Sequence, residues 1–376
     1  MMVKLGDVVN RVNGNVDRFT TDLQYYIGGE HYDSNELLIQ KRGSIQKDIN
    51  ILGFKFHFPF QAKDVIFMSR NPHLRKAGMV NFSGLCSDSS YILRTKNNDV
   101  LYEMYLPIVL QTDDFWDYCE THKSGGVNFL VNWGTLAAYE FELPPITEQK
   151  EIADKVWAAY NLKESYKKMI EATDEMVKSR FIEMFGKCEK QQTIQSVCNL
   201  FIDGDWIEAK DQSESGIRLI QTGNVGDGVY LDKSDKARYI TEETFRRLNC
   251  TEIFEGDILV SRLPEPVGRA CVLPNVGKAI TAVDCTIIRL KDIVTPEFFI
   301  SFTQTSLYQG QIIANTAGST RIRVSRSKLG EIKMPVPSID EQKQFSAIVQ
   351  QADKAKFELR EAIKRVESMM KSLMNS

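Results

Sequence analysis

A motif that occurs twice, 193 residues apart, constrains this chain more than any other feature. Pro144 is followed four residues later by Glu148-Gln149, and Pro337 is followed in the same way by Glu341-Gln342 (341 − 148 = 193). The chain then has no proline or glycine until Gly186 in the first case, and none to its end in the second. Because proline and glycine interrupt helices, each copy predicts the start of a long helix.

The segments between these stretches repeat at the same spacing. Asp64 and Asp257, also 193 residues apart, begin apolar segments that end in Ser69-Arg70 and Ser261-Arg262, the second segment being one residue shorter. A long-period repeat of this kind indicates duplication of a structural unit. We interpret that unit as a mixed α/β domain followed by a long helix.

The fold class that we expect is α+β, with two mixed α/β domains separated by two long helices and related by a pseudo-twofold internal repeat. The first domain spans residues 1–146, the first helix 147–185, the second domain 186–337 and the second helix 338–376. Helices of this length are typical of coiled coils rather than of average globular domains.

Apolar residues recur along both helices at the spacing of a coiled-coil seam. The pattern is clearer in the second helix, where one apolar position repeats every seven residues. The residues expected at the helix–helix interface are Ile152, Ala159, Tyr166, Phe345, Ala352, Leu359 and Val366. The complementary position of the second helix is expected at Ile348, Ala355, Ala362 and Met369. The alternative is a single amphipathic helix that packs on a domain.

Chain connectivity predicts that the two helices pair antiparallel. The first helix leaves the first domain and enters the second domain, and the second helix leaves the second domain. A parallel pair would need a long linker running back along the first helix, and none is present. Because connections are short, we expect an antiparallel coiled coil with the domains at opposite ends.

Known catalytic motifs are missing from the sequence. There is no phosphate-binding loop, no dinucleotide-binding glycine motif and no aminomethyltransferase tetrapeptide. The Glu-x-Lys of restriction nucleases occurs at Glu148-Gln149-Lys150 and Glu341-Gln342-Lys343, but that motif belongs on a strand, whereas both copies here begin helices. We therefore expect no catalytic residues in this chain.

Cysteine, histidine and apolar content exclude several other classes. Seven scattered cysteines without a C-x-x-C pair, and four scattered histidines, predict neither a disulfide framework nor a metal site. No apolar run is long enough for a membrane span, and the start of the chain lacks the apolar block of a signal peptide. We expect a cytoplasmic protein that does not associate with a membrane.

Local basic segments are the candidates for binding nucleic acid, since a net charge of −3 gives no general attraction. Glycines, hydroxyls and arginines in loops suit contacts to phosphates and to base edges. The candidate basic residues are Lys41, Arg42, Arg70, His73, Arg75, Lys76, Arg262, Arg269, Arg321, Arg323 and Arg326. Taken singly, each such segment is more typical of a solvated loop; the functional interpretation gains weight because Arg70 and Arg262 follow what we interpret as the same strand in each repeat.

A polar segment, Gln221-Thr222-Gly223-Asn224-Val225, follows a predicted strand in the second domain. A tight turn is the simpler interpretation. The alternative is a loop at the edge of a DNA-binding face, in which Gln221 and Asn224 would contact bases.

The whole pattern resembles the specificity subunit of type I restriction-modification enzymes. Two variable domains, each followed by P-x-x-x-E-Q and a long helix, are typical of that family. Three segments are similar to segments of its target recognition domains: Tyr26-Ile27-Gly28-Gly29-Glu30, Leu219 to Asn224 and Gly256 to Arg262. The resemblance covers essentially the whole chain.

The resemblance implies a non-catalytic subunit that binds double-stranded DNA. Each target recognition domain would read one half of a bipartite site, and the helices would set the spacer and dock two methyltransferase subunits. Restriction subunits that translocate DNA would complete the assembly. This chain would hold no cofactor, whereas the partner subunits would use S-adenosylmethionine, ATP and Mg²⁺. The loops Ser124 to Phe129 and Thr316 to Arg321 differ in length and charge, so the two half-sites should differ.

Two other interpretations remain at this point. One is an interaction scaffold with two globular domains on a coiled coil that binds only proteins, which the negative net charge mildly favours. The other is a fused nuclease or methyltransferase, which the missing motifs disfavour. Binding of pooled genomic DNA would separate the first from a DNA-recognition subunit.

Overall fold

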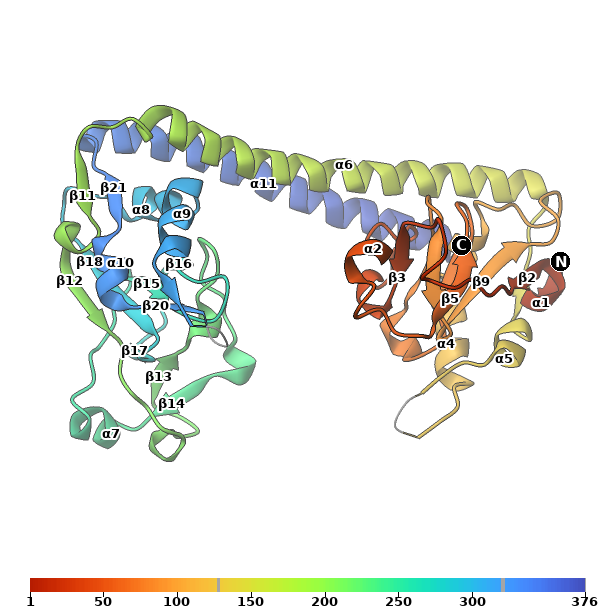
Figure 1. Cartoon of the computed structure of the whole chain (residues 1–376), viewed down its shortest axis with the longest axis horizontal. Helices are drawn as coiled ribbons and strands as arrows, with labels where there is room; N and C mark the ends of the chain where they lie inside the picture. Colours follow the sequence, from red (N-terminus) through yellow and green to blue (C-terminus); the bar gives the residue numbers. More distant parts are fainter. Residues whose placement is uncertain (127–128, 319–321, 376) are drawn as a thin grey trace. The chain divides into compact units, whose positions relative to one another are not determined.

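The structure is a computed structural model that describes residues 1–126, 129–318 and 322–375 (Figure 1). It divides into two compact units. Unit 1 consists of residues Met1–Lys168 and Leu359–Ser376, and unit 2 of Met169–Glu358. Each unit therefore contains a globular part together with one part of each long helix.

Unit 1 contains two four-stranded sheets, each built around hydrophobic residues that alternate or run continuously along short strands. The sheet whose strands contain more residues, called the larger sheet below, is antiparallel. Its order is β2 (Val9–Val12), β9 (Ser90–Thr95), β6 (Val65–Met68), β7 (Ala77–Met79). The smaller sheet has the order β4 (Gly43–Ser44), β3 (Tyr25–Ile27), β8 (Gly84–Ser87), β5 (Phe56–Phe60). Strands β3 and β8 of the smaller sheet are parallel.

Short helices cover the larger sheet of unit 1 and form its main core. Phe67 of β6 is fully buried, and its ring stacks on that of Trp116 with centroids 5.7 Å apart. The helices of this unit are α1 (Leu5–Val8), η1 (Gly29–His31), α2 (Ile45–Asp48), η2 (Pro72–Leu74), α3 (Leu106–Val109), α4 (Asp113–Thr121) and α5 (Trp133–Ala137). Strands β1 (Met2–Lys4) and β10 (Glu140–Glu142) pair beside them.

Unit 2 repeats this plan. Its four-stranded sheet has the order β12 (Cys198–Asp203), β18 (Cys285–Leu290), β15 (Ile258–Ser261), β16 (Ala270–Val272). Its smaller sheet has the order β14 (Arg238–Ile240), β13 (Ile217–Ile220), β17 (Ala279–Thr281). Two strand pairs complete it, β11 (Gln191–Thr193) with β21 (Lys333–Pro335) and β19 (Thr316–Ala317) with β20 (Arg323–Val324).

In unit 2, α8 (Pro296–Thr303), α9 (Ser306–Ala314) and α10 (Arg326–Glu331) pack on the larger sheet, with three phenylalanines of α8 fully buried. The other short helices of this unit are η3 (Gln195–Val197), η4 (Ala209–Asp211), η5 (Thr222–Asn224), η6 (Ser234–Lys236) and α7 (Glu242–Arg247). Corresponding strands have the same neighbours in both units, including the parallel pair β13 and β17. The predicted duplication of a mixed domain is therefore confirmed.

The repeated Glu-Gln motif has a structural role at the start of each long helix. Gln149 is fully buried; its amide donates to the carbonyls of Val100 and Pro144 and accepts from the Tyr102 N–H. Gln342 is equally buried and makes the same three bonds, to the carbonyls of Ile293 and Pro337 and from the Thr295 N–H. Every partner is displaced by the same 193 residues. The motif therefore binds each long helix to the loop that follows a strand of the larger sheet, β9 in unit 1 and β18 in unit 2.

The two long helices, α6 (Ile146–Phe185) and α11 (Ile339–Met374), pack together within both units (Figure 1). In unit 1 the early residues Val156 and Ala159 of α6 share a buried cluster with the late residue Val366 of α11. In unit 2 the late residue Phe181 of α6 packs on the early residue Phe345 of α11, with ring centroids 5.3 Å apart. The pairing is therefore antiparallel, as connectivity predicts.

The seven residues expected at the helix–helix interface are buried or half-buried. Ile152, Ala159, Tyr166 and Val366 belong to or pack against the cluster of unit 1, and Phe345 belongs to that of unit 2. Ala352 is buried and Leu359 half-buried. Within the three described stretches of the chain, no helix combines the length and apolarity that a membrane span requires.

Of the complementary seam residues that we predicted for the second helix, Ile348 and Ala362 are half-buried, but the other two are wrong by one residue. Ala355 and Met369 are exposed, and the positions that turn inward are the next ones along. These are Val349, Lys356, Ile363 and Met370, all buried or half-buried. Lys356 is polar, but its ammonium pairs with Asp174 of α6 at 2.7 Å, which allows the stem to lie in the seam.

Candidate functional site

Because the two units have equivalent strands, side chains at matched positions can be compared. Those that make the same contact in both units have a shared structural role. Lys76 and Arg269 occupy matched positions, each immediately before a strand, β7 and β16 respectively. Lys76 Nζ donates to the Gly29 carbonyl at 2.7 Å, and Arg269 Nη2 donates to the Thr222 carbonyl at 2.9 Å. Because both acceptors lie in the turn after the matched strands β3 and β13, these two cations brace the same turn.

Three of the four other N–H donors of Arg269 are occupied as well. They bond to the carbonyls of Val225, Pro264 and Pro266 at 2.6–3.0 Å. Desolvation lowers the pKa of this guanidinium from its ordinary value. We conclude that Arg269 organises its own loop, since a phosphate contact would require it to release these bonds.

The segment Gln221 to Val225 is the tight turn of the simpler interpretation. Asn224 is buried, and its Oδ1 accepts from the Gln221 N–H at 3.0 Å. In unit 1 the Nδ1 of His31 accepts from the Gly28 N–H at 2.8 Å in the matched turn. Asn224 therefore holds the backbone, whereas Gln221 is half-exposed, as are the next two residues of the turn.

Arg262 is buried, with 3% of its surface exposed. Its Nη2 donates to the Val283 carbonyl at 2.7 Å, and its Nε lies 3.3 Å from Asp203 Oδ1 without hydrogen-bond geometry. This position argues against the predicted contact of Arg262 with DNA.

The correspondence between Arg70 and Arg262 is also wrong. The N–H of Val324 donates to the Arg262 carbonyl, whereas the matched N–H of Val131 donates to the carbonyl of Ser69. Arg262 is thus the counterpart of Ser69, at the constant spacing of 193, and the one-residue deletion that we inferred does not exist. Arg70 corresponds to Leu263.

Arg70 and His73 are the exposed cationic candidates of the loop 70–76 in unit 1. In the described part of the chain, neither side chain has a hydrogen bond or an ion pair. The backbone at Arg70 is fixed by a bridge to Leu130. Both side chains can therefore contact a ligand without breaking a protein contact.

Arg75, in the same loop, is half-buried and held by an acid. Its Nη1 donates to Asp113 Oδ1 at 2.7 Å, and Asp113 Oδ2 also pairs with Lys371 at 3.0 Å. Arg75 first, and Lys371 second, lower the pKa of the Asp113 carboxyl by hydrogen bonding. The four basic candidates of this loop therefore divide into two exposed side chains, Arg70 and His73, and two that are bound within the protein, Arg75 and Lys76.

The neighbouring basic candidates Lys41 and Arg42 also differ in whether their side chains have a partner within the protein. Lys41 pairs with Asp33 at 2.6 Å, but both side chains are more than half exposed, so the pair contributes little. Arg42 is exposed and lies over the rings of Tyr25 and Phe82, 4.0 and 4.8 Å from their centroids. Within the described residues, the Arg42 guanidinium has no hydrogen bond or ion pair, so its donors are available.

Matched hairpins stand next to these loops in both units. Ser124 pairs with Leu130 in unit 1, and Ala317 pairs with Arg323 in unit 2. Gly125 and Gly318, 193 residues apart, both have positive φ, 104° and 107°, which glycine adopts at no steric cost. The paired residues are equally far apart in both hairpins, so the predicted difference in loop length is wrong, and the two hairpins differ in side chains.

The hairpin of unit 2 carries the basic candidates. Arg323 is exposed, and Arg326 is exposed with only a long contact of 3.9 Å to Asp203. Arg321 lies outside the described residues. Among the described residues, the available basic side chains near the hairpins are therefore Arg70 and His73 in unit 1 and Arg323 and Arg326 in unit 2.

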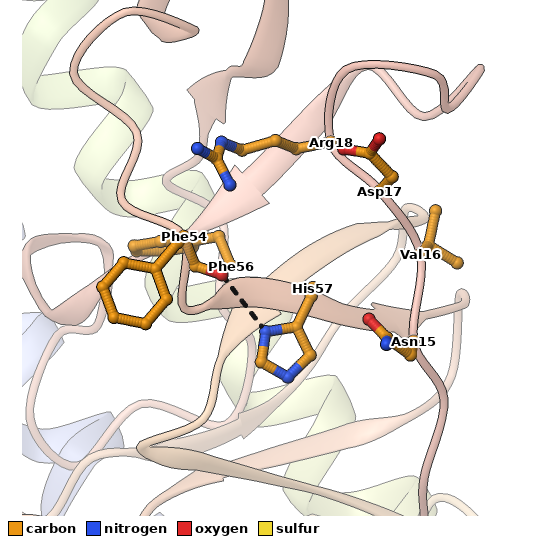
Figure 2. A pocket seen from close by; sticks show the side chains of 7 residues that line it. All are labelled: Asn15, Val16, Asp17, Arg18, Phe54, Phe56 and His57. Carbon is orange, nitrogen blue, oxygen red and sulfur yellow. Dashed lines mark hydrogen bonds between the residues drawn. The ribbon is translucent and has the colours of Figure 1, made fainter.

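Sequence reasoning missed a surface hollow of about 570 Å³ in unit 1 (Figure 2). It is lined by Asn15, Val16, Asp17, Arg18, Phe54, Phe56 and His57. Phe54 is 76% exposed, and His57 Nδ1 lies 3.4 Å from the Phe54 carbonyl oxygen. The alternation around Phe56 predicts a half-buried strand but gives no sign that an aromatic ring before it is exposed.

Most of the cysteine thiols are buried. Burial raises the pKa of the Cys86 and Cys198 thiols to about 12. In the ranges that the structure describes, no three His, Cys, Asp or Glu side chains gather as metal ligands.

Comparison with known proteins agrees with this architecture. The family model of the type I restriction modification DNA specificity domain matches residues 1–172 and 190–367. A solved structure titled as the structural basis of complex assembly and conformational transition of the type I R-M system is similar over 100% of this chain and 96% of that chain. The sequence identity is 18% and the TM-score 0.63, which supports the same fold.

Two further solved structures cover 100% of this chain. The HsdS subunit from Thermoanaerobacter tengcongensis is 17% identical over 95% of its own chain, with a TM-score of 0.43. The type I restriction-modification S subunit from M. genitalium is 12% identical over 94% of its own chain, with a TM-score of 0.49.

Proposed function

This chain belongs to the family of type I restriction modification DNA specificity proteins, and we propose that each of its two units reads one half of a bipartite DNA site. The family assignment makes it a sequence-specific DNA recognition subunit of a type I restriction-modification complex. The observation that supports the finer proposal is the duplicated fold, whose matched loops have the same backbone plan and different exposed side chains.

We assign DNA contact to the cations that have donors to spare. In unit 1 these are Arg70, His73 and Arg42, and in unit 2 Arg323 and Arg326. Arg321 belongs to the same hairpin by sequence. Free guanidinium groups can bond phosphates or the O6 and N7 of guanine, whereas Arg75, Lys76, Arg262 and Arg269 are engaged inside the protein.

The spacer between the half-sites is assigned to α6 and α11. Their antiparallel packing is built into both units, and a helix pair is stiffer than a flexible linker. A change in the length of either helix should therefore change the number of base pairs between the half-sites rather than their sequence.

Exposed apolar side chains on the helices are the proposed docking surface for two methyltransferase subunits. Leu162, Met169 and Met176 recur every seven residues on α6 and are 41–53% exposed, and Met369 on α11 is 47% exposed. Residues seven apart lie on one face of a helix, so the three on α6 form a second, open stripe. A row of exposed apolar residues on a long helix suits packing against partner helices.

Methylation and cleavage are assigned to the partner subunits. The methyltransferase subunits would use S-adenosylmethionine, and the translocating restriction subunits would use ATP and Mg²⁺. This chain would supply double-stranded DNA recognition and hold no cofactor of its own.

The proposal is tested by methylation in a genome that lacks other systems of this type. Co-expression of the chain with modification subunits should methylate one bipartite sequence, and neither component alone should do so. Replacing both Arg323 and Arg326 with alanine should relax only one half of that sequence. A chain that methylates or cuts DNA alone would overturn the proposal.

The interaction scaffold is the second outcome of the same experiment. A scaffold would bind modification subunits but leave the DNA sequence that they methylate unchanged. Gel-shift binding of pooled genomic DNA, measured with and without those subunits, gives an independent reading.

A further inference from the structure

The loop 70–76 of unit 1 holds a non-glycine residue in a conformation that its counterpart reaches with glycine. Arg75 has φ 49°, in the left-handed region, and the matched residue of unit 2 is Gly268, with φ 85°. Glycine adopts such angles freely, whereas an L-residue with a side chain does so at a cost. An arginine at this position indicates that its side chain does something that compensates for the strain.

The Arg75 side chain connects the loop to the last turn of α11 through one carboxylate. Asp113 accepts from Arg75 Nη1 at 2.7 Å and pairs with Lys371 Nζ at 3.0 Å. The backbone N–H of Asp113 also donates to Asn375 Oδ1 at 2.9 Å. All four residues belong to unit 1, and Asp113 is the only one of them that contacts both the loop and α11.

Unit 2 has the same helix start without the carboxylate. Thr112 and Thr305 cap α4 and α9 in the same way, each accepting from the N–H three residues on. The next residue is Asp113 in unit 1 and Ser306 in unit 2. The strained arginine and the acid that binds it are therefore both additions to a common framework.

A second contact fastens the same loop to α6. The Arg75 carbonyl accepts from the Asn35 N–H at 3.1 Å. The neighbouring Glu36 bonds to Lys163 Nζ at 2.8 Å and Lys167 Nζ at 3.2 Å, and Lys163 is only 3% exposed. Arg75 is thus the point at which connections from both long helices meet the loop that presents Arg70 and His73.

We propose that Asp113 is a positioning residue for DNA recognition by unit 1: by bridging Arg75 to Lys371 and Asn375, it fixes the loop that carries Arg70 and His73 relative to α11. This inference rests on the proposed function, in which that loop contacts DNA. Unit 2 has no such bridge at the matched position. A change in how α11 ends should therefore alter recognition by unit 1 and leave recognition by unit 2 unaffected.

The test is half-site selectivity of the chain in complex with modification subunits. Each half of the DNA site is randomised in turn, and the methylated sequences are counted. Asp113→Asn should reduce discrimination in the half read by unit 1 on the order of tenfold and leave the other half unchanged. Asp114→Asn is the matched control, because Asp114 is exposed on the same helical turn and should change neither half.

A second variant separates positioning from folding. Arg75→Gly removes the bridge and also the strain, giving unit 1 the residue that unit 2 has. It should keep the melting temperature of the chain close to that of the parent and still reduce discrimination in the same half-site. Loss of discrimination in both halves, or none in either variant, would overturn the inference.

Arg70→Ala distinguishes failure of the positioning role of Asp113 from failure of the proposed function. If Arg70→Ala weakens DNA binding while Asp113→Asn and Arg75→Gly leave selectivity unchanged, only the positioning role is wrong. If Arg70→Ala and His73→Ala together leave DNA binding unchanged, the loop does not contact DNA and the proposed function of unit 1 is wrong with it.

Discussion

The loop that follows β6 in unit 1 and the loop that follows β15 in unit 2 have a common framework and different exposed side chains. Lys76 and Arg269 brace the same turn, and both loops pass through a residue with positive φ. Arg70 stands where unit 2 has Leu263. A few buried contacts therefore preserve the backbone, and the exposed positions are free to differ, which suits two domains that recognise different half-sites.

The units also differ in how they hold the long helices. Unit 2 uses aromatic packing, in which Phe345 lies 5.3 Å from Phe181 and 5.7 Å from Phe185 between ring centroids. Unit 1 has Ile152 at the position matched to Phe345, and it adds ion pairs such as that between Lys163 and Glu36. We infer that apolar burial secures the helices more strongly in unit 2.

The largest expected effect comes from removing that aromatic packing. Phe345→Ala should destabilise unit 2 by about 3–5 kcal/mol, because a fully buried phenylalanine leaves a large cavity. Ile152→Ala should cost unit 1 about 1–2 kcal/mol, because Ile152 is only half-buried. Native-state hydrogen exchange measures the two units separately in the intact chain.

Phe357→Ala is the control for the first prediction. Phe357 lies on the same helix but is 61% exposed, so its loss should change the exchange free energy by less than about 0.5 kcal/mol. Equal losses for Phe345→Ala and Ile152→Ala would show that the two units hold the helices equally and would refute the contrast.

The shared framework predicts equal effects from a second pair of substitutions. Gln149→Ala and Gln342→Ala each remove three hydrogen bonds and leave a buried N–H without a partner, so each should destabilise its own unit by about 2–4 kcal/mol. Gln344→Ala, two residues after Gln342 and exposed, should have almost no effect. Hydrogen exchange that shows one loss much larger than the other would contradict a common framework.

The duplication and the helix starts could be predicted because their signals are local. The P-x-x-x-E-Q motif identifies a helix start by proline and acidic residues alone. The role of Gln149 and Gln342 could not be predicted in this way, because their partners lie 47–49 residues earlier in the chain. Sequence shows that the glutamine repeats, and the structure shows what it fastens.

Two errors show where sequence patterns become ambiguous. A heptad allows steps of three or four, and choosing alanine over lysine at positions 355 and 356 placed the complementary seam wrongly, because the Asp174 partner of Lys356 is on another helix. Matching Arg262 to Arg70 by residue type introduced a deletion, whereas backbone hydrogen bonds match Arg262 to Ser69. In both cases the prediction relied on side-chain type, whereas the helix geometry and the backbone hydrogen bonds determine which positions correspond.

The basic candidates divide for a related reason. Whether a cation is free depends on acids far away in sequence, such as Asp113 for Arg75 and Asp203 for Arg262. Clusters of Lys and Arg can be found in a sequence, but their availability cannot. This division reverses the expected roles of Arg70 and Arg262, two arginines that the sequence pattern equated.

Arg262→Ala and Arg70→Ala should have opposite signatures. Arg262→Ala removes a buried bond to Val283 and the partner of Asp203, so it should destabilise unit 2 by about 2 kcal/mol and leave the salt dependence of DNA binding unchanged. Arg70→Ala removes an exposed, unpaired cation, so stability should change by less than about 0.5 kcal/mol. If Arg70 contacts a phosphate, the slope of log K against log salt should fall by about 1.

Titration of DNA binding across salt concentrations, together with hydrogen exchange on the same variants, measures both quantities. Lys155→Ala is the matched control, because Lys155 is exposed on α6 and belongs to neither loop, so it should change neither the slope nor the exchange. A lower slope with unchanged stability for Arg262→Ala would place that arginine on the DNA after all. The matched loops would then differ less than their burial indicates, since both would use an arginine at the end of the same strand for one purpose.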